Sequence, residues 1–88
     1  MATKGTVALA DIFAMLRHCL PGWNKEEGLS EGRHNYQVHH AGRTFWRLPS
    51  GQHGKRAGSG EVQKGHVKAL AEFFDILDCA RGEIELLR

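Results

Sequence analysis

The sequence predicts an α+β domain in which a helix, an antiparallel sheet of two or three strands and a second helix follow one another, with both helices on one face of the sheet. Apolar residues recur at helical spacing near both ends of the chain, and residues between them alternate as strands do. The 88 residues suffice for a single domain (1–88) with one modest core, and for no separate cofactor domain.

A first helix is expected over residues 6–20, because apolar residues three and four positions apart share one stripe of a helix. These residues are Leu9, Ile12, Phe13, Leu16, Cys19 and Leu20. Thr6 is a suitable cap for its start, and Pro21 and Gly22 end it. The stretch from Trp23 to Gly32 is polar, with three glutamates and two glycines, which predicts a loop.

A hairpin is expected next. Over residues 34–40, Tyr36 and Val38 fall on one face and Asn35, Gln37 and His39 on the other, and Ala41-Gly42 reverses the chain into residues 43–48. The glycine-rich stretch from Pro49 to Gly60 predicts turns, with at most a short third strand near Lys55-Arg56 or Glu61-Val62.

A second helix is expected from Gly65 to about Cys79, because apolar residues again recur at helical spacing. Arg81-Gly82 breaks it, and residues 83–87 fit either a short edge strand or a third helix.

The amino-acid composition limits the classes of protein to which this chain can belong. With 41% hydrophobic and 25% charged residues, the chain has the composition of a folded domain. No apolar run is long enough to cross a bilayer, so we expect no membrane contact and a cytoplasmic location. Two cysteines in such a chain offer no disulfide framework, so Cys19 and Cys79 are expected as small buried thiols.

The net charge of +2 conceals a segregation of charge. Between residues 33 and 68 the only acid is Glu61, whereas the basic residues are Arg33, Arg43, Arg47, Lys55, Arg56, Lys64 and Lys68. This middle region is the candidate for contact with a polyanion, although a basic stretch is often only a solvated face.

Short motifs occur in a particular order along residues 8–79. They are Gly22-Trp23, Gly32-Arg33-His34, the turn at Ala41-Gly42, Leu48-Pro49, His53, and Lys64-Gly65 before Val67-Lys68-Ala69-Leu70. In this order the chain resembles HicA-type toxins, small messenger-RNA interferases whose fold is like that of double-stranded RNA-binding domains. It departs from the family pattern at Arg33, where serine or threonine is usual, and in the longer loop from Gly51 to Val62.

The resemblance implies a metal-independent endoribonuclease with a HicB-type antitoxin as partner, no cofactor, and His34 as the catalytic residue. Histidine suits that chemistry, because a base that titrates near neutral pH can take the proton of the ribose 2′-hydroxyl. Arg33 or Arg47 would offset charge on the phosphate, and Lys55, Arg56 and Lys64 would bind the RNA.

Three other histidines, His39, His40 and His53, are candidates for the acid that protonates the leaving 5′-oxygen, although each is more simply a surface histidine. A metal site is not expected, because His34 and His40 lie about 20 Å apart along a strand and no zinc-type ligand spacing occurs.

Among the hairpin aromatics, core packing is expected for Tyr36 and for at least one of Phe45 and Trp46. Any that faces solvent is a candidate for stacking on unpaired bases. Lys64 and the amides after Gly65 form a helix N-terminus where a phosphate could bind. The alternative function is a noncatalytic RNA-binding or protein-interaction domain of the same fold, in which Arg33 marks a lost active site.

Overall fold

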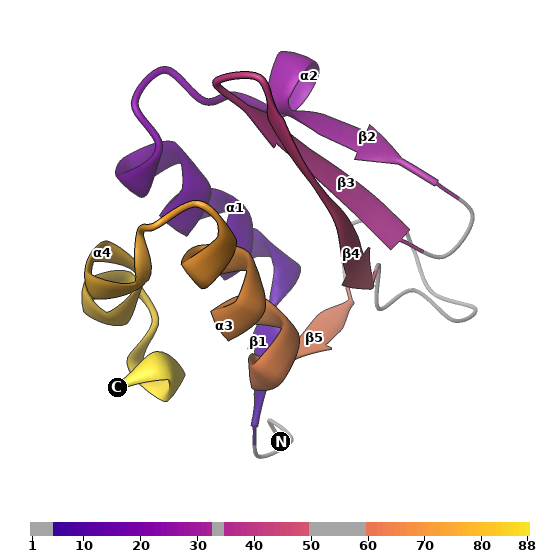
Figure 1. Cartoon of the computed structure of the whole chain (residues 1–88). Coiled ribbons are helices and arrows are strands. Elements are labelled where there is room, and N and C mark those ends of the chain that lie inside the picture. Colours follow the sequence, from indigo (N-terminus) through magenta and orange to yellow (C-terminus); the bar gives the residue numbers. More distant parts are fainter. Residues whose placement is uncertain (1–4, 33–34, 50–59) are drawn as a thin grey trace.

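The computed structural model describes residues 5–32, 35–49 and 60–88. Its strands and helices are β1 (Thr6–Ala8), α1 (Leu9–Cys19), α2 (Lys25–Gly28), β2 (Leu29–Glu31), β3 (Asn35–His40), β4 (Arg43–Pro49), β5 (Glu61–Gln63), α3 (Lys64–Phe73), α4 (Leu77–Glu83) and the 3-10 turn η1 (Glu85–Leu87). The α+β class is confirmed: α1 and α3 lie on the same side of an antiparallel sheet (Figure 1).

The main sheet has the strand order β2-β3-β4, and the hairpin of β3 and β4 lies where the alternation predicts it. Its third strand was predicted wrongly, because β2 falls in the stretch expected to be a loop. The residues Glu61-Val62 do form a strand, β5, but this strand pairs with β1 in a separate two-stranded sheet. The other position considered for a third strand, Lys55-Arg56, lies outside the described residues.

The segment before β2 is ordered by local contacts that strand propensity does not encode. The Asn24 side chain accepts a hydrogen bond from the Glu27 amide (2.8 Å) and so caps the short helix α2. The buried indole of Trp23 donates from Nε1 to the Gly28 carbonyl (3.0 Å). A Cβ at Gly28 would overlap the Trp23 ring, so this approach needs glycine. The chain is thereby turned so that Leu29 pairs with Val38.

The first helix begins later than expected. Thr6 is a strand residue opposite Gln63 and does not cap the helix, which starts at Leu9 with no side-chain cap. Hydrogen bonds flank this strand pair, since the Leu9 amide donates to the Gly60 carbonyl (3.1 Å) and the Lys64 amide donates to the Gly5 carbonyl (2.6 Å). The starts of α1 and α3 are therefore fixed to each other by the small sheet.

The core lies between the helices and the main sheet. Its fully buried large side chains are Leu9, Ile12, Met15, Leu16, Val38, Leu48, Val62, Val67 and Leu70. Tyr36 is buried, with its ring edge-on to Phe13, and Phe45 is half-buried against Phe73, as expected for the hairpin aromatics. Trp46 is the exception, because 62% of its surface is exposed.

The second predicted helix is interrupted. It ends at Phe73, the chain turns at Asp75 with a left-handed backbone (φ 61°), and α4 then starts at Leu77. After α4 the chain ends in the turn η1, so residues 83–87 form no edge strand. The turn at Asp75 carries α4 back against α1 (Figure 1).

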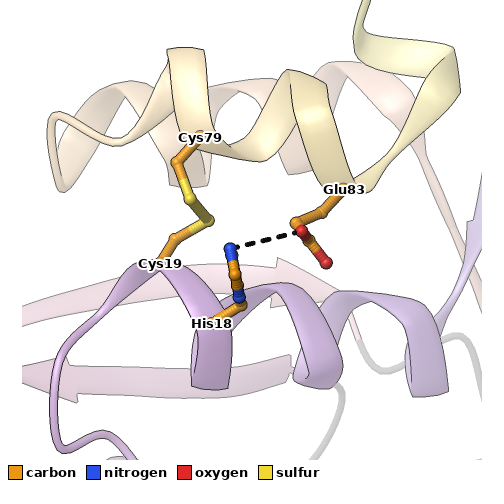
Figure 2. The surroundings of a disulfide bond; sticks show 4 residues. All are labelled: His18, Cys19, Cys79 and Glu83. Atoms are coloured by element: carbon orange, nitrogen blue, oxygen red, sulfur yellow. Dashed lines mark ion pairs between the residues drawn. A yellow bond between two sulfur atoms is a disulfide. The ribbon is translucent and has the colours of Figure 1, made fainter.

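This return brings together the two cysteines, which form a disulfide between the end of α1 and α4 (Figure 2). Cys19 and Cys79 are 60 positions apart in sequence, yet their Cα atoms are 5.8 Å apart, within the range that a disulfide spans. The expectation of two free thiols is therefore wrong. Beside the disulfide, His18 Nε2 lies 3.4 Å from a carboxylate oxygen of Glu83. None of the described helices has both the length and the apolar character needed to cross a membrane.

Candidate nucleic-acid interface

The main sheet has two faces of different character. We call the side that packs on α1 and α3 the helix face. Its residues include Leu29, Tyr36, Val38, His40, Arg43, Phe45 and Leu48. The opposite side is the outer face. Its residues are Ser30, Gln37, His39, Thr44, Trp46 and Arg47. Because successive side chains of a strand alternate between faces, Gln37, His39 and Thr44 lie on the outer face, whereas His40 and Arg43 lie on the helix face.

A β-bulge in the hairpin presents two neighbouring side chains to solvent together. Val38 pairs with Phe45 and Tyr36 pairs with Leu48, so β3 has one residue between these pairs, Gln37, where β4 has two. Those two are Trp46 and Arg47, and both are exposed. In a regular strand one of two consecutive residues faces the core, whereas a bulge removes that requirement locally. An indole and a guanidinium are thus adjacent on the outer face.

His39 lies in the middle of the outer face and connects three strands. Its Nε2 is 2.7 Å from Ser30 Oγ on β2, and its Nδ1 is 2.9 Å from Thr44 Oγ1 on β4. A hydroxyl can donate or accept, so both bonds persist whether the imidazole is neutral or protonated. The ring orientation is therefore fixed, and the half-buried imidazole holds the two hydroxyls beside it.

The next residue, His40, has a different environment. Its Nε2 donates to the Pro21 carbonyl (3.0 Å), and its ring lies edge-on to Phe74 with centroids 6.3 Å apart. Opposite His40 in the hairpin, the Arg43 guanidinium lies over the Phe73 ring, 4.4 Å from its centroid. These cationic and aromatic groups stabilise the packing of β3 and β4 on α3. We therefore interpret His40 as a structural residue.

Of the predicted site residues that the structure describes, only Arg47 lies on the outer face. Lys64 begins α3 beside the small sheet, away from the outer face. The other predicted site residues lie outside the described residues: Arg33, His34, Lys55 and Arg56, and with them the acid candidate His53. Asn35, which follows His34 in the sequence, pairs with Pro49, two residues beyond Arg47.

Ser30 and Thr44 are outer-face residues that sequence reasoning missed. Ser30 carried no signal, because its segment was expected to be a loop, and Thr44 was expected only as a residue of the second hairpin strand. Among residues 5–32, 35–49 and 60–88, no group of three or more histidine, cysteine or acidic side chains is arranged to hold a metal ion.

Comparison of this chain with known protein families, with curated proteins and with solved structures finds no match.

Proposed function

We propose that this protein binds messenger RNA and cleaves it without a metal ion or cofactor, as the toxin of a type II toxin–antitoxin pair. The proposal starts from the order of motifs that the chain shares with HicA-type toxins. The arrangement of α1, three antiparallel strands and α3, with both helices on one face, is consistent with the fold that this resemblance implies.

The observation that carries the proposal is the exposed pair of Trp46 and Arg47. RNA-binding surfaces combine aromatic rings, on which bases stack, with cations that contact phosphates. The pair lies toward the end of the hairpin where Asn35 pairs with Pro49, and Asn35 directly follows the proposed catalytic residue His34 in sequence.

In the proposed reaction, His34 accepts the proton of a ribose 2′-hydroxyl and the 2′-oxygen attacks the adjacent phosphorus. A 2′,3′-cyclic phosphate forms, and the 5′-oxygen leaves with a proton from an acid or from water. Arg47 would contact the nonbridging oxygens, whose charge grows in the transition state. Arg33, Lys55, Arg56 and Lys64 would bind the RNA backbone, and Lys64 would do so at the start of α3, away from the outer face.

The proposed partner is a HicB-type antitoxin, which would silence the enzyme by covering His34 and the basic residues. The proposed location is the cytoplasm, where messenger RNA is available.

The test is to incubate the native protein and a His34→Ala variant with a defined messenger RNA in chelator, and to measure cleavage on a gel and binding by fluorescence anisotropy. We expect the native protein to cleave, and His34→Ala to bind without cleaving. His66→Ala, at an exposed histidine of α3, is the matched control and should cleave normally. Salt-sensitive binding without cleavage by any of these proteins would favour the noncatalytic alternative.

A further inference from the structure

Trp46 is exposed in surroundings that do not favour a protein contact. In the described part of the chain, the large hydrophobic side chains exposed most are Trp46, at 62%, and Leu86, at 40%, which belongs to η1. The neighbours of Trp46 on the outer face are Gln37, Thr44 and Arg47, all polar or charged. Protein docking sites are apolar at their centre, whereas here an isolated indole is surrounded by hydrogen-bonding groups.

We infer that the outer face holds a subsite for one unpaired RNA base, which stacks on Trp46 while Arg47 contacts the adjoining phosphate. This inference rests on the proposed function, since it takes RNA to be the substrate. An indole provides the flat surface that base stacking requires, and a guanidinium provides paired donors for phosphate oxygens. The bulge in β4 makes the two side chains neighbours on one face.

The subsite names a substrate class, single-stranded RNA. In a duplex the faces of the bases are covered by their neighbours, so a protein reaches mainly phosphates and 2′-hydroxyls. Trp46 can stack only on a base that is already unpaired or splayed out. The subsite should therefore distinguish this protein from double-stranded RNA-binding domains, which share the order of helices and strands but read duplex shape.

Polar groups beside Trp46 are placed to contact the same nucleotide. Gln37 is opposite the bulge, and its amide can donate and accept hydrogen bonds. His39 holds the hydroxyls of Ser30 and Thr44 in fixed positions on the same face. His39 acts here as a positioning residue. Preorganised groups of this kind bind with less loss of side-chain entropy than mobile ones.

The strand register gives the distance along β3 between the subsite and Asn35, the residue that follows His34 in the sequence. Gln37 is two residues from Asn35, which corresponds to about 7 Å along β3. His39 is two residues further, about 13 Å from Asn35. His39 is therefore farther from Asn35 than Gln37 is, and its bonds to Ser30 and Thr44 give it a positioning role.

The experiment uses the fluorescence of the two tryptophans, of which Trp23 is only 6% exposed. In the His34→Ala background, which should prevent cleavage, a short single-stranded RNA and a fully paired RNA of the same length are titrated. We expect single-stranded RNA to quench the fluorescence of Trp46 saturably and the duplex to leave it unchanged. Trp46→Phe should keep most of the affinity and lose the quenching, because Trp23 is shielded.

Trp46→Ala should lower the affinity for single-stranded RNA by about fivefold to 150-fold, the range expected for loss of one stacked base. Leu86→Ala removes the other large hydrophobic side chain that is exposed in the described part of the chain, and it should not change the affinity for single-stranded RNA. Unchanged affinity in Trp46→Ala, or equal quenching by the duplex, would overturn the subsite. Cleavage by the native protein is measured separately. Cleavage without quenching would refute the subsite alone, whereas quenching without cleavage would support the subsite and refute the ribonuclease.

Discussion

The two faces of the main sheet use the same kinds of residue for different purposes. His39 and His40 are consecutive, yet the first is held by hydroxyl groups on the outer face and the second by a backbone carbonyl and Phe74 on the helix face. Arg43 lies over the Phe73 ring on the helix face, whereas Arg47 lies beside Trp46 on the outer face. Residue type alone therefore does not identify an RNA-binding side chain. The face that the strand register assigns to it must also be known.

A large loss of stability should follow removal of the disulfide that joins α1 to α4. Without it, the unfolded chain gains the freedom of a loop closed over a sequence separation of 60 residues. The chain-entropy model then predicts a loss of about 4 kcal/mol in the free energy of unfolding. The double variant Cys19→Ser, Cys79→Ser should show this loss in urea denaturation at 15 °C. The native protein in excess reductant is its matched control. Equal midpoints with and without reductant would contradict the prediction.

The same disulfide also tests the proposed location. The cytoplasm keeps protein thiols reduced, so a cytoplasmic protein should carry Cys19 and Cys79 largely as thiols. Alkylation of intact cells before lysis, followed by mass measurement, counts the thiols of the protein. Two alkylated cysteines would agree with the cytoplasmic proposal, and a disulfide that persists in cells would place the protein in an oxidising compartment.

Substitutions at two neighbouring residues of β4 should have different effects, one on the stability of the protein and the other on RNA binding. Leu48 is fully buried on the helix face, so Leu48→Ala should lower the free energy of unfolding by about 2–5 kcal/mol. Arg47→Ala should change it by less than about 0.5 kcal/mol while weakening RNA binding and reducing its salt dependence by about one counterion. Urea denaturation measures the free energy of unfolding of each variant. Titration with RNA at several salt concentrations measures its affinity and the salt dependence of that affinity. Similar loss of stability in the two variants would contradict our assignment of the faces.

Sequence reasoning identified the helices and strands whose apolar residues recur at a regular spacing. The stripes of α1 and α3 and the alternation of β3 extend over enough residues to be recognised. Strand β2 has three residues, and its position depends on Trp23 and Gly28. The pairing of β1 with β5, and the disulfide, depend on contacts between distant segments, which no local pattern records.

The candidate site was predictable to a similar extent. Charge segregation and the aromatic residues indicated the hairpin, and Arg47, named as a candidate phosphate contact, has an exposed side chain in the structure. The simultaneous exposure of Trp46 and Arg47 was not predictable, because regular alternation would place consecutive residues on opposite faces. It results from the register of β3 on β4, which includes the bulge.

Gly28→Ala tests how β2 is attached to the rest of the sheet. The added methyl group would overlap the Trp23 indole, which is itself buried, so we expect a loss of about 1–3 kcal/mol. Gly82→Ala is a matched control, since a Cβ at this position of α4 meets nothing within 4 Å. It should stabilise the protein by roughly 0.5–1 kcal/mol. The midpoints of thermal denaturation are compared for Gly28→Ala and Gly82→Ala. Equal midpoints in the two variants would show that Trp23 can move aside.

Among the substitutions expected to destabilise the fold measurably, His39→Ala should have the smallest effect. The substitution removes two hydrogen bonds, but Ser30 is exposed and Thr44 only half-buried, so water can replace the imidazole. We expect a loss of about 1 kcal/mol, whereas a structural link essential to β2 would cost several times more. The affinity for single-stranded RNA should fall because the two hydroxyls lose their fixed positions. His39→Gln can restore one of the bonds and should recover part of the affinity. Unchanged binding with a large loss of stability would assign His39 to the framework of the sheet and limit the RNA subsite to Trp46, Arg47 and Gln37.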